Sequence, residues 1–204
     1  MAAPYAVTED HSSWKFHVDG SATWRVHSAD LPLCNLLRHA LLADVPVQAV
    51  EKASFYAWDG PIERSMVALR LGQLPVRGLE PLTFEIKVRA SLDAPLTWVT
   101  SEDVVGDDYR VRRFKDGSRF LIAPLLAGQS LHVVCQTSLG TGRRRTQWSS
   151  VFPVMVSQED GSCLFTVETT GACTAAQAWR DAITGAAGTM DAIAAAAAST
   201  AEQC

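Results

Sequence analysis

The sequence predicts a mixed α+β fold in which helix-bearing ends bracket a middle block of strands. Apolar residues recur at helical spacing near residues 31–45 and again over the last segment of the chain. Between these two regions, residues 82–135 alternate apolar and polar side chains, as half-buried strands do. The chain has 204 residues, 48% of them apolar, so it is long enough to bury one large core or two smaller ones.

A hairpin and a helix are predicted first. Residues 14–27 alternate around a central Asp-Gly pair, which is typical of tight hairpin turns. Ser28 or Asp30 can cap the helix that follows, and Pro32 lies in its first turn, where a missing N–H costs nothing. The helix must end before Pro46. Its predicted apolar face comprises Leu33, Leu36, Leu37, Ala40 and Leu41.

The middle of the chain is predicted to begin with a strand over residues 47–60. A short helix is expected after Pro61, a favourable first helical residue, and it ends at Gly72 and Pro75. The apolar face of this helix is predicted to contain Ile62, Met66 and Leu69, with Leu71 as a further member. Four more strands are expected at "LTFEIKVRA", "APLTWVTSEDV", "SRFLIAP" and "QSLHVVCQTS".

Two further strands, "SSVFPVMV" and "CLFTVETT", precede a long C-terminal helix. Thr174 and Gln177 have the spacing of a capping box, in which each side chain bonds a backbone N–H at the helix start. A heptad-like seam then follows over a helix of roughly 25 residues. The seam comprises Trp179, Ile183, Ala186, Met190, Ile193 and Ala197.

Two glycines, Gly185 and Gly188, interrupt this helix, and each costs about 1 kcal/mol relative to alanine. Small residues allow two helices to approach closely, so we expect the seam to be covered. Two alternatives stay open for the cover: the protein's own sheet, or a helix of another molecule.

Charge and cysteine content restrict the classes of function. A net charge of −4 means that the protein has no overall positive potential, which argues against a protein that binds nucleic acid directly. The chain starts without a charged segment followed by an apolar one, and no apolar run reaches about 18 residues, so neither a signal peptide nor a membrane span is predicted. The five cysteines are scattered and never spaced CxxC, which supports neither a disulfide framework nor a zinc ribbon and favours a reducing compartment.

No catalytic or metal-binding constellation stands out. Adjacent acidic pairs such as Glu102-Asp103 lie in polar, turn-like surroundings and are interpreted as solvated loops. The five histidines have neither HExxH spacing nor a CxxC nearby, and "GTGRRR" lacks the GK[ST] of a phosphate loop. Its basic run, Arg143, Arg144 and Arg145, is either a solvated loop or a contact with an acidic partner or a nucleic acid backbone.

Five ordered motifs are similar to those of one protein family. "DLPLCNLLRHALLADVPVQAV" resembles the pattern D-x-[ST]-x-x-N-x-L-R-R-x-x-[IL]-x-x-[VI]-P-x-x-A-[VI], with matches at Asn35, Leu37, Arg38, Val45, Pro46, Ala49 and Val50. "IERSMVALRLGQLPV" is similar to "DEFIAHRLGLIPL", and "VTSEDVVGDD" to "VTSRDL". "LIAPLLAGQSLHVVCQTSLGTGRRRTQWSSV" and "FTVETTG" resemble the family's later motifs. The chain therefore resembles the alpha-like assembly subunit of multisubunit DNA-dependent RNA polymerase, a family that includes the third-largest subunit of eukaryotic RNA polymerase II, its archaeal counterpart and the N-terminal domain of bacterial alpha.

The resemblance implies a discontinuous dimerisation domain, a sheet plus two long helices, over residues 1–48 and 149–204. An inserted, mostly-β domain would occupy residues 49–148. The implied function is that of a non-catalytic structural subunit, which forms a heterodimer with a smaller alpha-like subunit and serves as the assembly platform for the largest and second-largest polymerase subunits. DNA and RNA would be met only indirectly, through the complex.

The same resemblance implies no cofactor, no metal, no catalytic residue and no membrane. It implies an intracellular location, in a nucleus or cytoplasm, or in a viral factory or virion if the source is viral. Some relatives carry a cysteine-ligated zinc loop or an iron–sulfur insertion, which this short chain lacks, and this suggests a reduced or viral polymerase.

The expected site residues combine the family motifs with the C-terminal seam and the basic run described above. The dimer contact is expected at Leu33, Asn35, Leu36, Leu37, Arg38, Leu41, Trp179, Ile183, Met190 and Ile193. The contact with the larger subunits is expected at Arg38, His39, Arg70, Arg143, Arg144 and Arg145. His39 stands where the family has a second arginine, so this contact is expected to differ there.

Two other classes of function stay open. The chain could be a stand-alone protein-interaction module that reuses the alpha-like fold, or a small enzyme. An enzyme requires a pocket with convergent titratable groups, whereas a polymerase subunit requires apolar faces that are poorly covered in the monomer.

Overall fold

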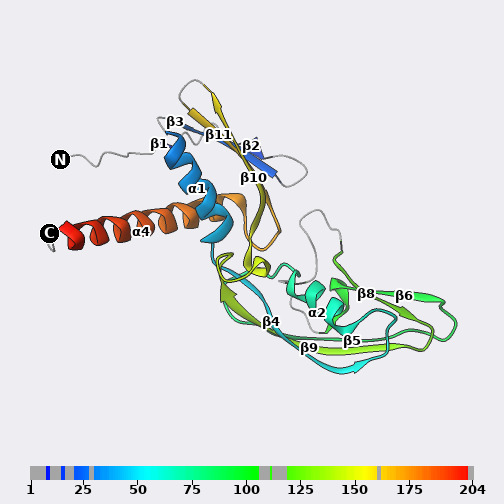
Figure 1. Cartoon of the computed structure of the whole chain (residues 1–204). Coiled ribbons are helices and arrows are strands. Elements are labelled where there is room, and N and C mark those ends of the chain that lie inside the picture. The colour runs from blue at the N-terminus through cyan, green and yellow to red at the C-terminus, as the bar shows by residue number, and fades with distance from the viewer. Residues whose placement is uncertain are drawn as a thin grey trace. The chain divides into compact units, whose positions relative to one another are not determined.

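The computed structural model describes residues 8–9, 15–16, 21–27, 30–105, 111, 119–159 and 162–201. Helices and strands are both present, which confirms the predicted α+β class (Figure 1). The chain divides into two compact units. The first comprises Met1–Val45, Thr141–Arg143 and Ser149–Cys204, and the second Pro46–Gly140 and Arg144–Trp148. The second unit thus begins at Pro46 instead of residue 49, and residues 141–143 belong to the first unit.

An antiparallel sheet forms the base of the first unit. Its strands run in the order β1-β3-β11-β10, and β2 also pairs with β3. The strands are β1 (Thr8–Glu9), β2 (Lys15–Phe16), β3 (Ser21–His27), β10 (Val151–Glu159) and β11 (Ser162–Thr169). The Asp-Gly turn predicted at residues 19–20 lies outside the described residues, as does Ser28. Strands from the two ends of the chain therefore share one sheet.

Two helices complete this unit, α1 (Leu31–Ala43) and α4 (Ala175–Ala201). Asp30 caps α1 as predicted, because its carboxylate accepts a hydrogen bond of 3.0 Å from the Leu33 N–H. The Thr174 hydroxyl likewise accepts a bond of 3.2 Å from the Gln177 N–H at the start of α4. The reciprocal half of the capping box is not formed, because the Gln177 side-chain oxygen accepts from the Arg180 guanidinium at 2.8 Å and its NH2 group donates to the Asp181 carboxylate at 2.9 and 3.0 Å.

An aromatic cluster forms the core between sheet and helices. Trp24 of β3, Phe165 of β11 and Trp179 of α4 are each at most 1% exposed. The Trp179 ring lies edge-on to Trp24, with centroids 4.9 Å apart, and 5.2 Å from Phe165. Trp24 and Phe165 are stacked at 5.8 Å. The three rings hold α4 against the two central strands.

The second unit contains a four-stranded antiparallel sheet, a two-stranded ribbon and a short helix. The sheet order is β4-β9-β5-β7, and β6 pairs with β8 to form the ribbon. Its elements are β4 (Val47–Trp58), α2 (Arg64–Gly72), β5 (Thr83–Arg89), β6 (Leu96–Thr100), β7 (Val104–Val105), β8 (Leu121–Leu126) and β9 (Ser130–Gly140), with single 3-10 turns at Ser101–Asp103 and Thr146–Trp148. The predicted strand-rich middle is therefore present, and its apolar core lies within this unit.

The short helix α2 differs from the prediction in its start and in its buried face. The helix starts at Arg64 because Glu63 has an extended backbone conformation; just before it, the Ile62 carbonyl accepts a hydrogen bond of 3.1 Å from the Trp58 indole N–H. Leu71 is buried as predicted and Val67 is buried beside it, whereas the predicted Met66 and Leu69 are 47% and 58% exposed. Val67 and Leu71 lie four residues apart and so share one side of the helix.

One disulfide joins Cys34 of α1 to Cys163 of β11, with their Cα atoms 6.7 Å apart. The expectation that the scattered cysteines support no disulfide is wrong for this pair. The two residues lie 129 positions apart in the sequence, so the tertiary fold alone brings them together. Among the described residues, no helix is both long enough and apolar enough to cross a bilayer.

Replacing Trp179 with alanine should destabilise the first unit by about 3–5 kcal/mol, because it removes a fully buried ring from the aromatic cluster and leaves a cavity. Urea unfolding followed by near-UV circular dichroism measures the loss. Arg180→Ala is the matched control, because this neighbouring side chain is exposed and its removal should change stability by only about 0.5 kcal/mol. A loss below about 1 kcal/mol for Trp179→Ala would contradict the packing described above.

Candidate partner interface

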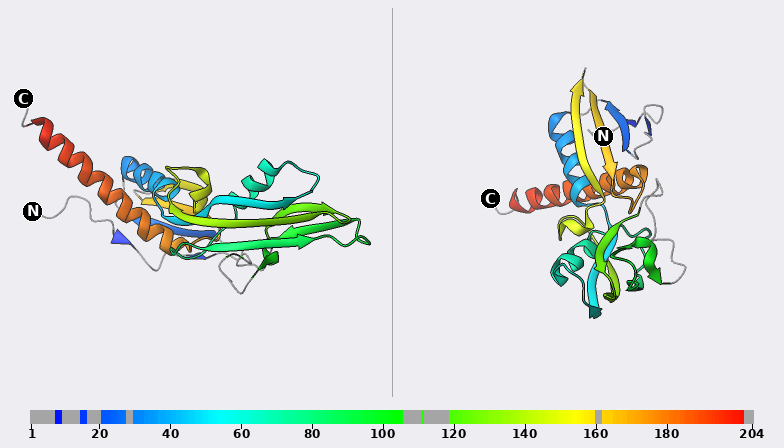
Figure 2. Two further views of the ribbon diagram at one scale, coloured as in Figure 1. Left: turned by 90° about the horizontal axis from the view of Figure 1, so that it is seen from below. Right: turned by 90° about the vertical axis from the view of Figure 1, so that its right-hand side faces the viewer.

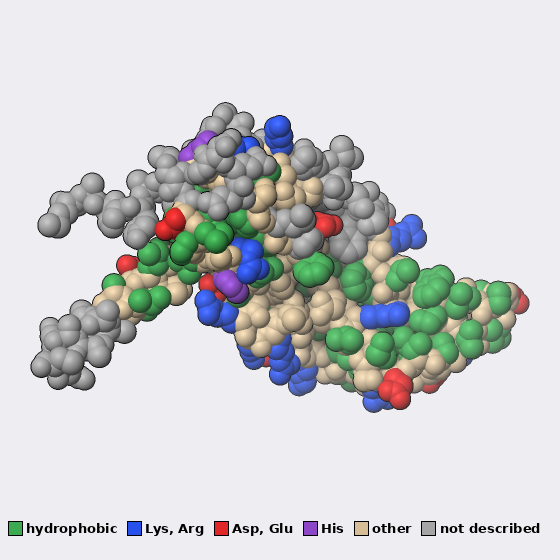
Figure 3. Space-filling model, turned by 45° about the horizontal axis from the view of Figure 1, so that its top comes forward, with side chains coloured by type: hydrophobic (Ala, Val, Ile, Leu, Met, Phe, Trp, Pro, Cys, Tyr) green, Lys and Arg blue, Asp and Glu red, His purple; other side chains and the backbone are tan. Residues whose placement is uncertain are grey.

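The long helix α4 is buried along its first half and exposed along its second. Ala178, Trp179, Ala182 and Ala186 are at most 4% exposed, and they face the unit's own core. Further along, Met190 and Ile193 are 38% and 63% exposed. Figures 1 and 2 show α4 continuing past α1 toward the C-terminus, and Figure 3 shows hydrophobic side chains along this stretch. The predicted seam is therefore half intramolecular and half open, and the Ala197 side chain lies outside the described residues.

The outer side of α1 is a second exposed face of this unit. Cys34, Leu37, Ala40 and Leu41 face inward and are at most 2% exposed. Leu31 is 55% exposed at the start of the helix, although sequence reasoning did not select it. Helical spacing could have found it, because at about 100° per residue Leu31 lies on the side of the helix opposite the predicted apolar face.

The structure sorts the predicted dimer residues into three groups. Leu37, Leu41 and Trp179 are buried inside the unit's own core. Half-buried positions are Leu33, Leu36, Arg38 and Ile183, and exposed positions are Asn35, Met190 and Ile193. The surface that a partner can reach on this unit therefore comes from the second and third groups.

The two interior glycines of α4 have different surroundings. A Cβ added to Gly185 would lie 2.9 Å from the Asp44 Cβ, which belongs to the residue that follows α1. Gly185 therefore permits the close approach of the two helices. A Cβ at Gly188 would meet nothing within 4 Å, so no contact among the described residues requires a glycine there.

Arg143 binds the C-terminal end of α1. Its guanidinium forms a bidentate ion pair with the Asp44 carboxylate, whose Nη2–Oδ2 distance is 2.9 Å, and its backbone N–H donates to the Ala43 carbonyl at 3.1 Å. The preceding Gly142 lies so close to the Leu42 carbonyl that a Cβ would collide with it. This arginine therefore has a structural partner within its own unit.

Arg144 is engaged within the second unit. Its guanidinium bonds Glu51 at 2.5 Å and lies 4.7 Å from the centroid of the Trp148 ring. The Ser138 hydroxyl and this guanidinium hold the pKa of the Glu51 carboxyl below its ordinary value. The Trp148 indole N–H in turn donates to the Ser138 carbonyl at 2.9 Å. Arg145 is exposed and is the one of the three whose guanidinium makes no such contact with a described residue.

The remaining predicted contact residues lie on two helices. Arg38 is half-buried on α1 and its Nη2 lies 3.4 Å from Nε2 of the exposed His39. Arg70 on α2 donates to the Ile122 carbonyl of β8 at 3.2 Å. Arg38, His39 and Arg143 belong to the first unit, and Arg70, Arg144 and Arg145 to the second.

The adjacent acids Glu102 and Asp103 have structural partners. Asp103 caps a 3-10 turn by accepting the Thr100 N–H at 2.7 Å, and Glu102 pairs with Arg119 at 2.7 Å. These acids are thus used in a cap and an ion pair and are not merely solvated, as the sequence suggested. Among the described residues, no three His, Cys, Asp or Glu side chains lie together as a possible metal site.

Comparison with known proteins points to one family. The family model described as the RNA polymerase Rpb3/Rpb11 dimerisation domain matches residues 25–187. The DNA-directed RNA polymerase subunit Rpo3 of Methanocaldococcus jannaschii is 27% identical over 156 residues, which cover 76% of this chain and 79% of the relative.

Two other relatives are longer. The DNA-directed RNA polymerases I and III subunit rpac1 of Dictyostelium discoideum is 23% identical over 155 residues, covering 60% of this chain and 44% of the relative. Rpo3 of Pyrococcus horikoshii is 25% identical over 143 residues, covering 66% and 54%. This chain spans about half the length of these two relatives.

Alanine at the two glycines of α4 should have opposite effects. Gly188→Ala should stabilise the helix by about 1 kcal/mol, because it gains helix propensity at an open position. Gly185→Ala should destabilise the unit, because the new methyl group would press on Asp44. Hydrogen exchange of the α4 amides measures both effects. Exchange rates that change in the same direction for both variants would contradict the different surroundings described for Gly185 and Gly188.

Proposed function

This chain belongs to the family of the RNA polymerase Rpb3/Rpb11 dimerisation domain, and from that premise we propose that it is a structural subunit of a DNA-dependent RNA polymerase. The match runs from within β3 to the middle of α4. It includes α1 and two of the three aromatic-cluster residues, Phe165 and Trp179. The relatives' names, each a DNA-directed RNA polymerase subunit, support the same assignment.

In this proposal, the chain first forms a heterodimer with a smaller alpha-like subunit. The observation that carries this proposal is the open half of α4, where Met190 and Ile193 leave apolar surface in water. These residues continue the same seam that upstream packs on the unit's own core, so a second helix laid along them extends an existing apolar contact. The outer side of α1, with Leu31 and the half-buried Leu33 and Leu36, supplies further apolar area.

The heterodimer then serves as the platform for the largest and second-largest polymerase subunits. Arg38, His39, Arg70 and Arg145 are the contact candidates. The carboxylates of Asp44 and Glu51 already neutralise the charges of Arg143 and Arg144, whereas Arg70 contacts a neutral carbonyl. We assign Arg143 and Arg144 to positioning the loop that carries Arg145.

The proposed subunit supplies no catalytic residue, and it meets DNA and RNA only through the assembled enzyme. The acids of the Glu102-Asp103 pair support this role, since their carboxylates are used in a cap and an ion pair. Transcription is an intracellular process, so we place the protein inside the cell or in a virus-derived compartment.

Co-expression with the smaller alpha-like subunit from the same source tests the dimer contact. Ile193→Glu should weaken the complex at least about tenfold, because burying an unpaired carboxylate at the seam costs more than about 1.4 kcal/mol. Ala195→Glu is the matched control, because this residue is also exposed but lies on the opposite side of the helix. Affinity is measured by titration of the purified subunits.

Two results would contradict the proposal. Equal affinities for the Ile193→Glu and Ala195→Glu variants would exclude the seam as the contact. Failure of the unaltered chain to bind the smaller subunit would favour a stand-alone interaction module. Both substituted side chains are exposed in the single chain, so neither variant is expected to unfold.

A further inference from the structure

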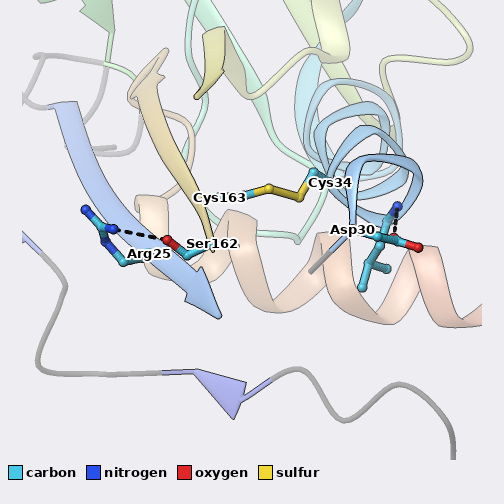
Figure 4. Close-up of a disulfide and its surroundings, with 6 residues drawn as sticks. Arg25, Asp30, Cys34, Ser162 and Cys163 are labelled. Carbon is cyan, nitrogen blue, oxygen red and sulfur yellow. Dashed lines mark hydrogen bonds between the residues drawn. A yellow bond between two sulfur atoms is a disulfide. The ribbon is translucent and has the colours of Figure 1, made fainter. Parts of the chain in front are cut away.

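The disulfide between Cys34 and Cys163 joins two elements that pack face to face. Cys34 lies in the first turns of α1 and Cys163 on the central strand β11, as Figure 4 shows. The two residues are 1% and 0% exposed. Cys163 shares the buried side of β11 with Phe165, so the bond lies on the same sheet face as the aromatic cluster.

We propose that this cysteine pair is a redox-controlled cross-link that locks α1 onto the sheet of the first unit. Cys34 and Cys163 lie 129 residues apart, and the whole second unit lies between them in the sequence. A cross-link restricts the unfolded chain more strongly as the closed loop lengthens, so this bond should restrict it more than a bond between cysteines close in sequence would. The inference concerns the fold of the chain and does not depend on the proposed function.

The bond forms by thiol–disulfide exchange with a low-molecular-weight disulfide such as oxidised glutathione. One cysteine thiolate attacks the small disulfide and releases one glutathione thiol. The second cysteine then attacks the mixed disulfide and releases the other. The two protein thiols lose two electrons and two protons, and the oxidant is reduced to two thiols. The reverse exchange with a small thiol opens the bond.

Burial makes this exchange depend on opening of the unit. A reductant must reach a sulfur atom, and both sulfur atoms belong to residues at most 1% exposed. Reduction therefore requires α1 to separate from β11, an opening that the disulfide itself opposes. The redox state of the pair therefore follows its surroundings slowly while the unit is closed and faster when the unit opens.

A further buried cysteine does not compete for this exchange. Cys135 of β9 is 0% exposed, and burial raises the pKa of its thiol to about 12, so it stays protonated at neutral pH. It belongs to the second unit, whereas both cysteines of the disulfide belong to the first. Cys135→Ala is therefore a suitable control, because it removes one thiol and leaves the cross-link in place.

The test compares the full chain refolded with oxidised glutathione and the same chain kept in a thiol reductant. After denaturation and alkylation, intact mass should report three modified cysteines for the oxidised chain and five for the reduced one, because the chain has five cysteines and the bond uses two. The melting temperature of the oxidised chain should be higher by roughly 10 °C. Cys135→Ala should keep this difference.

The Cys34→Ala/Cys163→Ala double variant separates the cross-link from other effects of the reductant. Its melting temperature should be the same with and without reductant. Reduction of the unaltered chain should also accelerate in sub-denaturing urea, since urea favours opening. The proposal is overturned by five modified cysteines in the oxidised sample, by glutathione adducts in place of the bond, by equal melting temperatures, or by a double variant that responds as the unaltered chain does.

Discussion

Burial of Trp179 against the stacked rings of Trp24 and Phe165 is the constraint on which the first unit depends. The indole comes from the second turn of α4 and fixes that helix on the sheet by its N-terminal end. An α-helix is stiff over this length, so fixing one end also fixes the direction of the rest. The helix has 27 residues, more than the sheet can cover, and its second half is therefore held out in solvent.

This geometry gives the two halves of one apolar seam different physical roles. Substitutions at Trp179 change the stability of the single chain, whereas substitutions at Ile193 leave it folded, because that side chain is already in water. The same division applies to α1, where Leu37 faces the core and Leu31 faces outward. A pattern of apolar residues alone does not separate these roles, because burial within one chain and burial between two chains require the same residue types.

Local interactions account for the parts of the fold that the sequence predicts well. Asp30 caps α1, Pro46 follows its end, and the strands appear where apolar and polar residues alternate, because each of these signals acts within a few residues. The burial of Val67 on α2, the Gln177 side-chain bond and the Cys34–Cys163 disulfide were not predicted. Each of these depends on a partner that tertiary structure supplies, or on a choice between two local partners of similar strength.

The candidate site follows the same rule. The seam on α4 could be recognised from its spacing, but its division into a buried and an exposed half required the aromatic cluster. The basic run looked uniform in the sequence, yet Arg143 and Arg144 bind carboxylates of different units, whereas the guanidinium of Arg145 makes no such ion pair with a described residue. Adjacent residues of one type therefore have different partners, which their shared charge does not reveal.

The open end of α4 has a consequence for the abundance of the protein in a cell. Chaperones and proteases recognise unassembled chains by their exposed apolar residues. Met190 and Ile193 are two such residues on an otherwise folded unit. Under the proposed function, the partner masks them on assembly. Copies made in excess of that partner would then be removed, so the cellular level of this chain would follow the supply of its partner without any dedicated regulator.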